Sequence, residues 1–273
     1  MQFKTVSPAL GIEVGAVDLA RPLDDAAFKR IENAWHEGLI LLFRNQHLDE
    51  AQQATFGARF GELGKVLHQH GGRGTHPGVM YISNIVEDGR LIGALPDGEM
   101  YFHSDQCYTE KPAMATMLYA MEIPSRGGNT LFANMYRAYE TLSQNVKQRI
   151  EGKKAWNVYD YSGNPTKRGN AGGDAPRYAH PMVRTHPATK RKALYVNRLM
   201  TESIEAMPRE ESDELLDELF DHTEQPQFVY EHVWRPGDLI LWDNRCTLHA
   251  RTDFDASERR KLRRVALLGE VPV

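Results

Sequence analysis

Cysteine and long apolar runs are scarce in this sequence of 273 residues. Its two cysteines, Cys107 and Cys246, are too few for a disulfide framework and fit a reducing compartment, and we expect both to be small core residues. No apolar run approaches the roughly 20 residues that are needed to span a bilayer. The first residues lack the basic and then apolar pattern of a signal peptide. These absences predict a cytoplasmic protein that has no membrane partner.

An excess of charge of one sign is absent as well. The formal net charge of −4 gives no overall attraction to nucleic acid, so we expect no nucleic-acid partner. Internal repeats and low-complexity tracts are also missing. The composition is that of an ordinary soluble globular chain, long enough to bury a large core in one large domain or two small ones.

Short strand-like segments separated by turn signals dominate the sequence after residue 79. Helical periodicity marks four segments, at residues 23–38, 48–61, 135–152 and 208–225. Many short strands with a few helices favour a mainly β sandwich or barrel that has its helices packed on the outside. The Gly-, Asn- and Pro-rich residues 161–177 show no periodicity and predict a flexible lid.

The sequence contains two His-x-Asp pairs, and their surroundings distinguish them. After His47, Asp49 is followed three residues later by Gln52, which is the pattern of a capping box at a helix start. The carboxylate of Asp49 is therefore expected to accept backbone N–H groups rather than to bind a metal. The second pair, His103 and Asp105, lies between aromatic residues in a strand-like segment.

In a strand, residues i and i+2 point to the same face, so we expect His103 and Asp105 to lie side by side. His249 is the candidate for a third ligand, although an ordinary strand histidine is the alternative interpretation. Two histidines and one carboxylate on one metal are typical of non-haem Fe(II) oxygenases. A zinc-dependent hydrolase using the same residues and a non-catalytic, cupin-like binding protein are the alternative functions.

Two arginines share one face of the last predicted strand. Alternation over residues 258–268 places Arg260 and Arg264 on the face of Leu262. A buried guanidinium requires an anionic partner. The two positions lie about 13 Å apart along a strand, so we expect two separate anions. An exposed basic edge strand is the alternative.

Four motifs occur in a characteristic order: "HSD", "GGNTLFANM", "WDNRCTLH" (which contains Trp242) and "RRKLRR". Together they resemble the TauD/TfdA family of Fe(II)/2-oxoglutarate-dependent dioxygenases, and the resemblance extends over nearly the whole chain. It implies a double-stranded β-helix, a jelly-roll and cupin-like barrel with flanking helices, as a single domain over residues 1–273. It also implies a homo-oligomer, either a dimer or a tetramer.

The resemblance further implies roles for individual residues. His103, Asp105 and His249 would bind Fe(II). Thr130 and Arg260 would hold the far carboxylate, on C5, of the co-substrate 2-oxoglutarate. Dioxygen would be the second co-substrate, and the reaction would hydroxylate a small organic acid while releasing succinate and CO2.

The substrate side is implied less directly. Arg264 would hold a carboxylate or sulfonate of the substrate, and both aromatic and non-aromatic acids stay open. Tyr101 and Tyr108 are expected to be walls for its apolar body. Gln106, beside the iron aspartate, and His70 are the other substrate-binding candidates. Which acid the enzyme uses stays open at this point.

Overall fold

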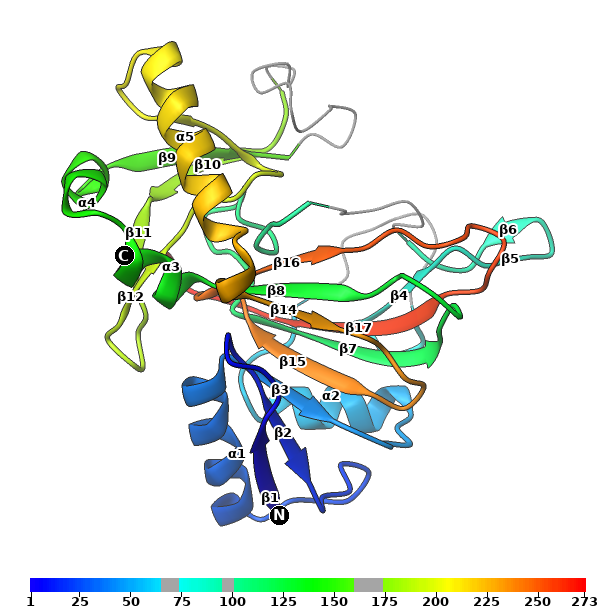
Figure 1. The fold of residues 1–273 in the computed structure, drawn as a ribbon. Helices are drawn as coiled ribbons and strands as arrows, with labels where there is room; N and C mark the ends of the chain where they lie inside the picture. Colours follow the sequence, from blue (N-terminus) through cyan, green and yellow to red (C-terminus); the bar gives the residue numbers. More distant parts are fainter. Residues whose placement is uncertain (65–73, 95–100, 160–173) are drawn as a thin grey trace.

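A computed structural model describes residues 1–64, 74–94, 101–159 and 174–273. Most of the predicted lid and the candidate His70 lie outside these residues. The fold is mainly β with five α-helices among the described residues (Figure 1). No helix within this part of the chain is long and apolar enough to cross a membrane.

The largest sheet has seven strands in the order β1-β2-β3-β15-β7-β17-β4. Its neighbours are antiparallel except for the parallel pair β2 and β3. The strands are β1 (Gln2–Thr5), β2 (Ile12–Gly15), β3 (Ile40–Phe43), β15 (Leu239–Asp243), β7 (Ala115–Glu122), β17 (Lys261–Leu267) and β4 (Val79–Ser83).

A second, antiparallel sheet of three strands has the order β14-β8-β16. It contains β14 (Val229–His232), β8 (Thr130–Asn134) and β16 (Thr247–Arg251). Three smaller sheets complete the described strands. They contain β10 (Arg177–Pro181), β9 (Lys154–Val158) and β13 (Thr201–Ile204); β11 (Val183–Thr185) and β12 (Lys192–Leu194); and β5 (Val86–Glu87) and β6 (Arg90–Leu91).

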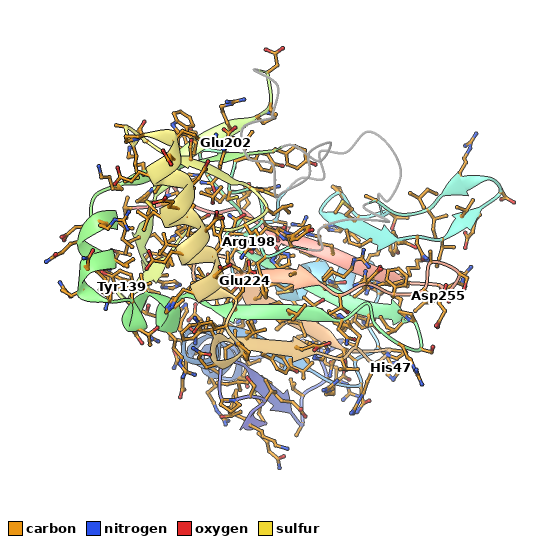
Figure 2. The ribbon with its side chains drawn as sticks, turned by 45° about the horizontal axis from the view of Figure 1, so that its top comes forward. His47, Tyr139, Arg198, Glu202, Glu224 and Asp255 are labelled. Atoms are coloured by element: carbon orange, nitrogen blue, oxygen red, sulfur yellow. The ribbon has the colours of Figure 1, made fainter. Side chains whose placement is uncertain are left out.

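The described helices are α1 (Asp25–Gly38), α2 (Glu50–Ala58), α3 (Met135–Thr141), α4 (Gln144–Ile150), α5 (Arg209–Thr223) and the short 3₁₀ helix η1 (Pro226–Phe228). Helices α1 to α4 each begin at a capping side chain, whereas α5 follows Pro208, whose side chain makes no capping hydrogen bond. Asp24 caps α1, and Asp49 forms the predicted capping box with Gln52 at the start of α2. His47 is exposed beside it (Figure 2), so this His-x-Asp pair marks a helix start as expected.

The helical segment expected over residues 135–152 forms two short helices, α3 and α4. The chain leaves the helical conformation at Leu142, whose backbone is extended. Ser143 then caps a new helix by accepting the backbone N–H of Val146. A serine followed by helix-forming residues competes with continuation of the first helix, and the predicted segment therefore becomes α3 and α4.

The seven-stranded sheet has an apolar cluster on each face. Alternate residues of β3 belong to different clusters: Leu42 packs toward α3, α5 and the three-stranded sheet, whereas Leu41 packs toward α1 and α2. Figure 1 shows α1 and α2 beside the N-terminal strands and the three-stranded sheet on the other side. Burial on both faces explains why β3 is apolar throughout, and the layered arrangement is consistent with the predicted jelly roll.

Candidate active site

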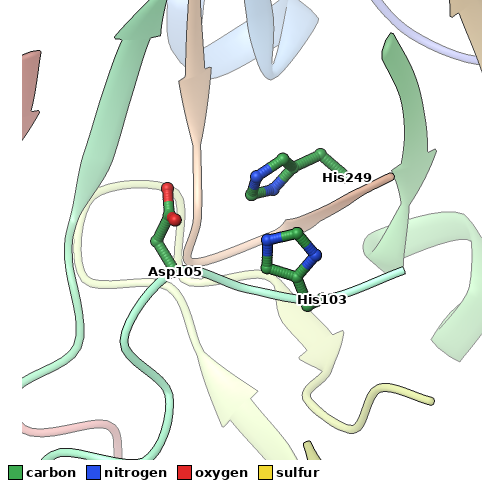
Figure 3. Close-up of side chains that lie close together, drawn as sticks. All are labelled: His103, Asp105 and His249. Carbon is green, nitrogen blue, oxygen red and sulfur yellow. The ribbon is translucent and has the colours of Figure 1, made fainter. Parts of the chain in front are cut away.

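Three side chains from distant parts of the chain converge in the interior. Each of His103, Asp105 and His249 offers one ligand atom, and these atoms lie within 4.8 Å of one another (Figure 3). All three residues are buried. His249 lies on β16, and the backbone of His103 exchanges two 2.9 Å hydrogen bonds with it. The two imidazole rings are consequently held together, with centroids 4.1 Å apart.

The strand expected around these ligands is not present. His103 makes only an isolated bridge to His249, and the chain turns from Asp105 onward. Gln106 has a φ of +57°, which is incompatible with a continuing strand. The two ligands therefore lie together because of tertiary hydrogen bonds rather than because of strand periodicity.

Asp105 is fixed by donors on both of its oxygens. Thr116 Oγ1 donates to Oδ2, and Asn244 Nδ2 approaches the same oxygen at 3.4 Å. The guanidinium of Arg264 lies 2.9 Å from Oδ1. Burial alone would raise the pKa of Asp105, but Arg264, then His249 and His103, hold it well below its usual range. The carboxylate is therefore ionised, as a metal ligand must be.

The ion pair with Asp105 corrects one expectation about Arg264. No run of acidic residues stands near Arg264 in the sequence, and a bound anion was expected to be its partner. The chain instead supplies Asp105 from a distant segment. Arg264 also lines the cavity described below, so it faces the ligand group and the cavity at once.

The "WDN" motif, residues 242–244, contacts His249 and Asp105. Asn244 accepts a hydrogen bond from Trp242 Nε1 at 2.9 Å and donates to Thr116 Oγ1 at 3.1 Å. The Trp242 ring lies 4.7 Å from the ring of His249, centroid to centroid. One short segment thus positions both an imidazole and the carboxylate, by packing and by hydrogen bonds respectively.

A second buried group, His186, Asp243 and Cys246, has the composition of a metal site but not its chemistry. His186 Nδ1 accepts backbone N–H groups from Ala188 and Thr189, so the proton is on Nε2. That nitrogen donates to Asp243 at 3.0 Å. His186 has no remaining lone pair for a metal, and the group is a structural hydrogen-bond network. Both cysteines are buried and free of disulfides, as expected.

A cavity between the two main sheets opens onto the ligand group. Apolar side chains from β4 and β7, Met80, Ile82 and Leu118, form one wall. Three arginines line it, Arg251, Arg260 and Arg264. Within the described residues, Asp105 is the only acidic residue that does so. The cavity is therefore shaped for anionic molecules that have an apolar part.

Arg260 and Thr130, the two candidates for binding 2-oxoglutarate, both line the cavity. The guanidinium of Arg260 donates to the carbonyl oxygen of Gly128 through Nε and Nη2, at 3.2 and 3.1 Å. Burial, and then the charge of Arg251, lower the pKa of Arg260 to about 9. Thr130 is buried, and its Oγ1 accepts the indole N–H of Trp234 at 3.0 Å. Its hydroxyl proton is consequently available to another acceptor.

The substrate-side candidates have different outcomes. Gln106 and Tyr108 line the cavity. Tyr159 lies against Tyr108, with ring centroids 4.4 Å apart, and lines the cavity too; it follows β9, and no local motif identifies it. Tyr101 is 40% exposed and is not among the described residues that line the cavity, so its role as a wall stays a prediction. His70 lies outside the described residues.

Two imidazoles and an ionised carboxylate beside an arginine-lined cavity are the donor set of a non-haem metal oxygenase. The family model "Taurine catabolism dioxygenase TauD, TfdA family" matches residues 2–266. Pentalenolactone F synthase of Streptomyces arenae is 32% identical over 287 residues, which cover 98% of this chain and 96% of the relative. Alpha-ketoglutarate-dependent 2,4-dichlorophenoxyacetate dioxygenase of Burkholderia sp. (strain RASC) is 34% identical over 272 residues, covering 94% and 91%.

A solved structure, AAD-2 in complex with Mn(II) and N-oxalylglycine, matches with a TM-score of 0.86 and 29% identity over 99% of each chain. The chain belongs to the TauD/TfdA family. It is an Fe(II)/2-oxoglutarate-dependent dioxygenase, so a metal ion and 2-oxoglutarate are its cofactor and co-substrate, with O2 as the second co-substrate. The zinc-dependent hydrolase and the non-catalytic binding protein are set aside by this membership.

Proposed function

We propose that His103, Asp105 and His249 hold the Fe(II) of this dioxygenase and that its substrate is a small organic acid. The observation that carries this proposal is the position of the three ligand atoms, within 4.8 Å of one another, at the wall of a cavity lined by three arginines. When bound, the iron supplies the oxidising chemistry, with 2-oxoglutarate consumed to succinate and CO2. The protein binds and orients the reactants and excludes water.

Arg260 and Thr130 are suited to the far carboxylate of 2-oxoglutarate. Arg260 is 5% exposed, and its guanidinium donates two hydrogen bonds to one neutral acceptor, the carbonyl oxygen of Gly128. A buried guanidinium is stabilised strongly by a carboxylate, which it can bind through two parallel hydrogen bonds. The hydroxyl of Thr130 adds a neutral donor on the same wall.

Arg264 is suited to the anionic group of the primary substrate. Its side chain is 17% exposed, and one of its nitrogens contacts Asp105. Arg264 contacts Asp105 and also lines the cavity, so its positive charge is placed beside an anion bound there. The apolar wall of Met80, Ile82 and Leu118, together with Tyr108, would pack against the apolar or aromatic body. The relative named for 2,4-dichlorophenoxyacetate supports an aromatic acid as substrate.

A panel of organic acids tests this substrate class. Aryloxy carboxylates, aliphatic carboxylates and sulfonates are each compared with a neutral ester or amide of the same shape. Substrate-dependent succinate formation is the readout. We expect turnover with acids and at least tenfold less with their neutral partners, because an arginine–carboxylate contact contributes about 1.5–3 kcal/mol. Equal turnover of acids and neutral partners would exclude an anion site at Arg264.

Four expectations stay predictions. They are the cytoplasmic location, the homo-oligomeric state, the single domain over residues 1–273 and the lid at residues 161–177. Limited proteolysis of the apo enzyme and of the enzyme with metal, 2-oxoglutarate and substrate tests the lid, because an ordered lid is cleaved more slowly.

A further inference from the structure

Arg251 lines the same cavity as Arg260 and Thr130, and sequence motifs do not single it out. It lies two residues after His249 on β16, so both side chains are on one face of the strand. Its backbone is paired in register with Thr130 on the adjacent strand β8. Cross-strand partners have neighbouring side chains on the same face. Arg251 therefore lies beside the hydroxyl that is proposed to bind the far carboxylate.

The guanidinium groups of Arg251 and Arg260 share a neighbour, the ring of Phe254. Both are over the ring of Phe254, at 5.0 and 5.7 Å from its centroid. The charge of Arg251 also contributes to the lowered pKa of Arg260. Two positive charges in a partly buried site repel each other, and an anion that contacts both relieves the repulsion. This part of the cavity is consequently suited to a carboxylate that has a guanidinium on each side.

We infer that Arg251 is a second guanidinium for the far carboxylate of 2-oxoglutarate, and that Arg251 and Arg260 together select 2-oxo acids that carry a second carboxylate. This inference rests on the proposed function, which assigns that carboxylate to Arg260 and Thr130. A carboxylate has two oxygens and about four lone-pair positions, enough for two guanidinium groups and one hydroxyl. Arg251 is thus a specificity residue for the co-substrate.

The test is a binding measurement that needs no turnover. Isothermal titration of the Mn(II)-loaded protein gives the Kd of 2-oxoglutarate and of 2-oxopentanoate, which has the same chain length and a methyl group in place of the far carboxylate. We expect Arg251→Met to raise the Kd of 2-oxoglutarate about tenfold, which corresponds to about 1.4 kcal/mol. The Kd of 2-oxopentanoate should not change, and this unchanged value also shows that the variant is folded.

Arg259→Met is the matched control. Arg259 is on the same segment as Arg260, but its side chain is 55% exposed and pairs with Glu122. This variant should leave both Kd values unchanged. An unchanged Kd for 2-oxoglutarate in Arg251→Met, or equal weakening of both acids, would overturn the inference.

The same measurements separate this inference from the proposed function. If Arg260→Met removes the preference for 2-oxoglutarate and Arg251→Met keeps it, the inference fails while the proposed function stands. A wild-type protein that binds both acids equally tightly would overturn both, because no residue would then recognise the far carboxylate.

Discussion

At the scale of single residues, the direction of one hydroxyl depends on a tryptophan. Thr130 Oγ1 accepts the N–H of Trp234, and indole nitrogen can only donate, so one oxygen lone pair is occupied. The ring of Trp234 packs edge-on against His232, which is bonded to Asp238 at 3.0 Å. All four residues are buried. The surrounding packing thus holds the Thr130 hydroxyl as a donor.

Trp234→Phe should weaken 2-oxoglutarate binding by about 1 kcal/mol, a rise of about fivefold in its KM. The rate at saturation should change less, since the ligand group is untouched. Steady-state kinetics at varied 2-oxoglutarate measures both parameters. In a Thr130→Val background the same substitution should add nothing to the KM. An additive effect in the double variant would mean that Trp234 acts through packing rather than through Thr130.

At the same scale, the buried carboxylate of Asp105 depends on the donors around it. Burying a carboxylate is costly unless it is paired and hydrogen-bonded. Three neighbours of Asp105 offset that cost. The guanidinium of Arg264 lies 2.9 Å from its carboxylate, Thr116 donates a hydrogen bond to it, and the Asn244 amide approaches it at 3.4 Å. The same ion pair links the proposed iron ligand, Asp105, to the proposed substrate anchor, Arg264. We therefore expect an anion that competes for Arg264 to change the surroundings of Asp105.

At the scale of elements, the two faces of β17 have different roles. Arg264 of β17 and Arg260, which directly precedes the strand, line the cavity. Arg263 lies on the other face, toward the apolar cluster that contains α1 and α2. It is 3% exposed and donates to Gln53 Oε1 and to the carbonyl oxygen of Leu48, both at 2.7 Å. Alternation predicted the cavity face but not the burial of Arg263 on the other face. Its partners come from α2 and the segment before it, and no local pattern indicates that contact.

Arg263→Ala should lower the free energy of unfolding by about 2–4 kcal/mol, because it leaves the buried Gln53 amide and Leu48 carbonyl without their charged donor. The Kd of 2-oxoglutarate should stay within twofold of wild type. Urea denaturation and calorimetric titration provide the two values. The exposed Arg259→Ala is the control and should leave the free energy of unfolding unchanged. A large loss of 2-oxoglutarate affinity in Arg263→Ala would contradict the assignment of separate roles to the two faces.

Local rules determined how much of each element could be predicted from the sequence. The capping box at Asp49 and the apolar stripes of α1 and α5 are set by neighbours within a few residues, and those helices were predicted correctly. The turn after Asp105 and the contribution of Tyr159 depend on partners far along the chain. The three candidate ligands could be chosen from residue types and from a family resemblance. The ion pair with Arg264 could not, because it joins two distant segments.

At the scale of the whole molecule, burial of histidines makes folding sensitive to acid. His180 is 1% exposed and bonded to the carbonyl oxygen of Thr109 at 2.8 Å. Burial lowers its pKa to about 4, from an ordinary value of about 6.5. Between these two values the unfolded chain binds a proton that the folded chain does not. Stability therefore falls as the pH drops from about 6.5 to about 4.

The loss attributable to His180 should reach about 3 kcal/mol at pH 4, since one pKa unit corresponds to about 1.4 kcal/mol. Urea denaturation of the wild type and of His180→Gln at pH 7, 5.5 and 4.5 measures it. The variant should lose less stability than the wild type over this range. A parallel decline of the two proteins would show that other groups account for the acid sensitivity. His232, whose pKa burial also lowers, shifts both curves in the same direction.

The most direct test of the central claim is an anaerobic titration with Fe(II) and 2-oxoglutarate, followed by the weak visible charge-transfer band of the iron chelate. The wild type and His47→Ala should develop the band, because His47 is exposed at a helix start. His103→Ala and His249→Ala should not, because each removes one of the three converging ligand atoms. A band that persists in His103→Ala and is lost in His47→Ala would contradict the account.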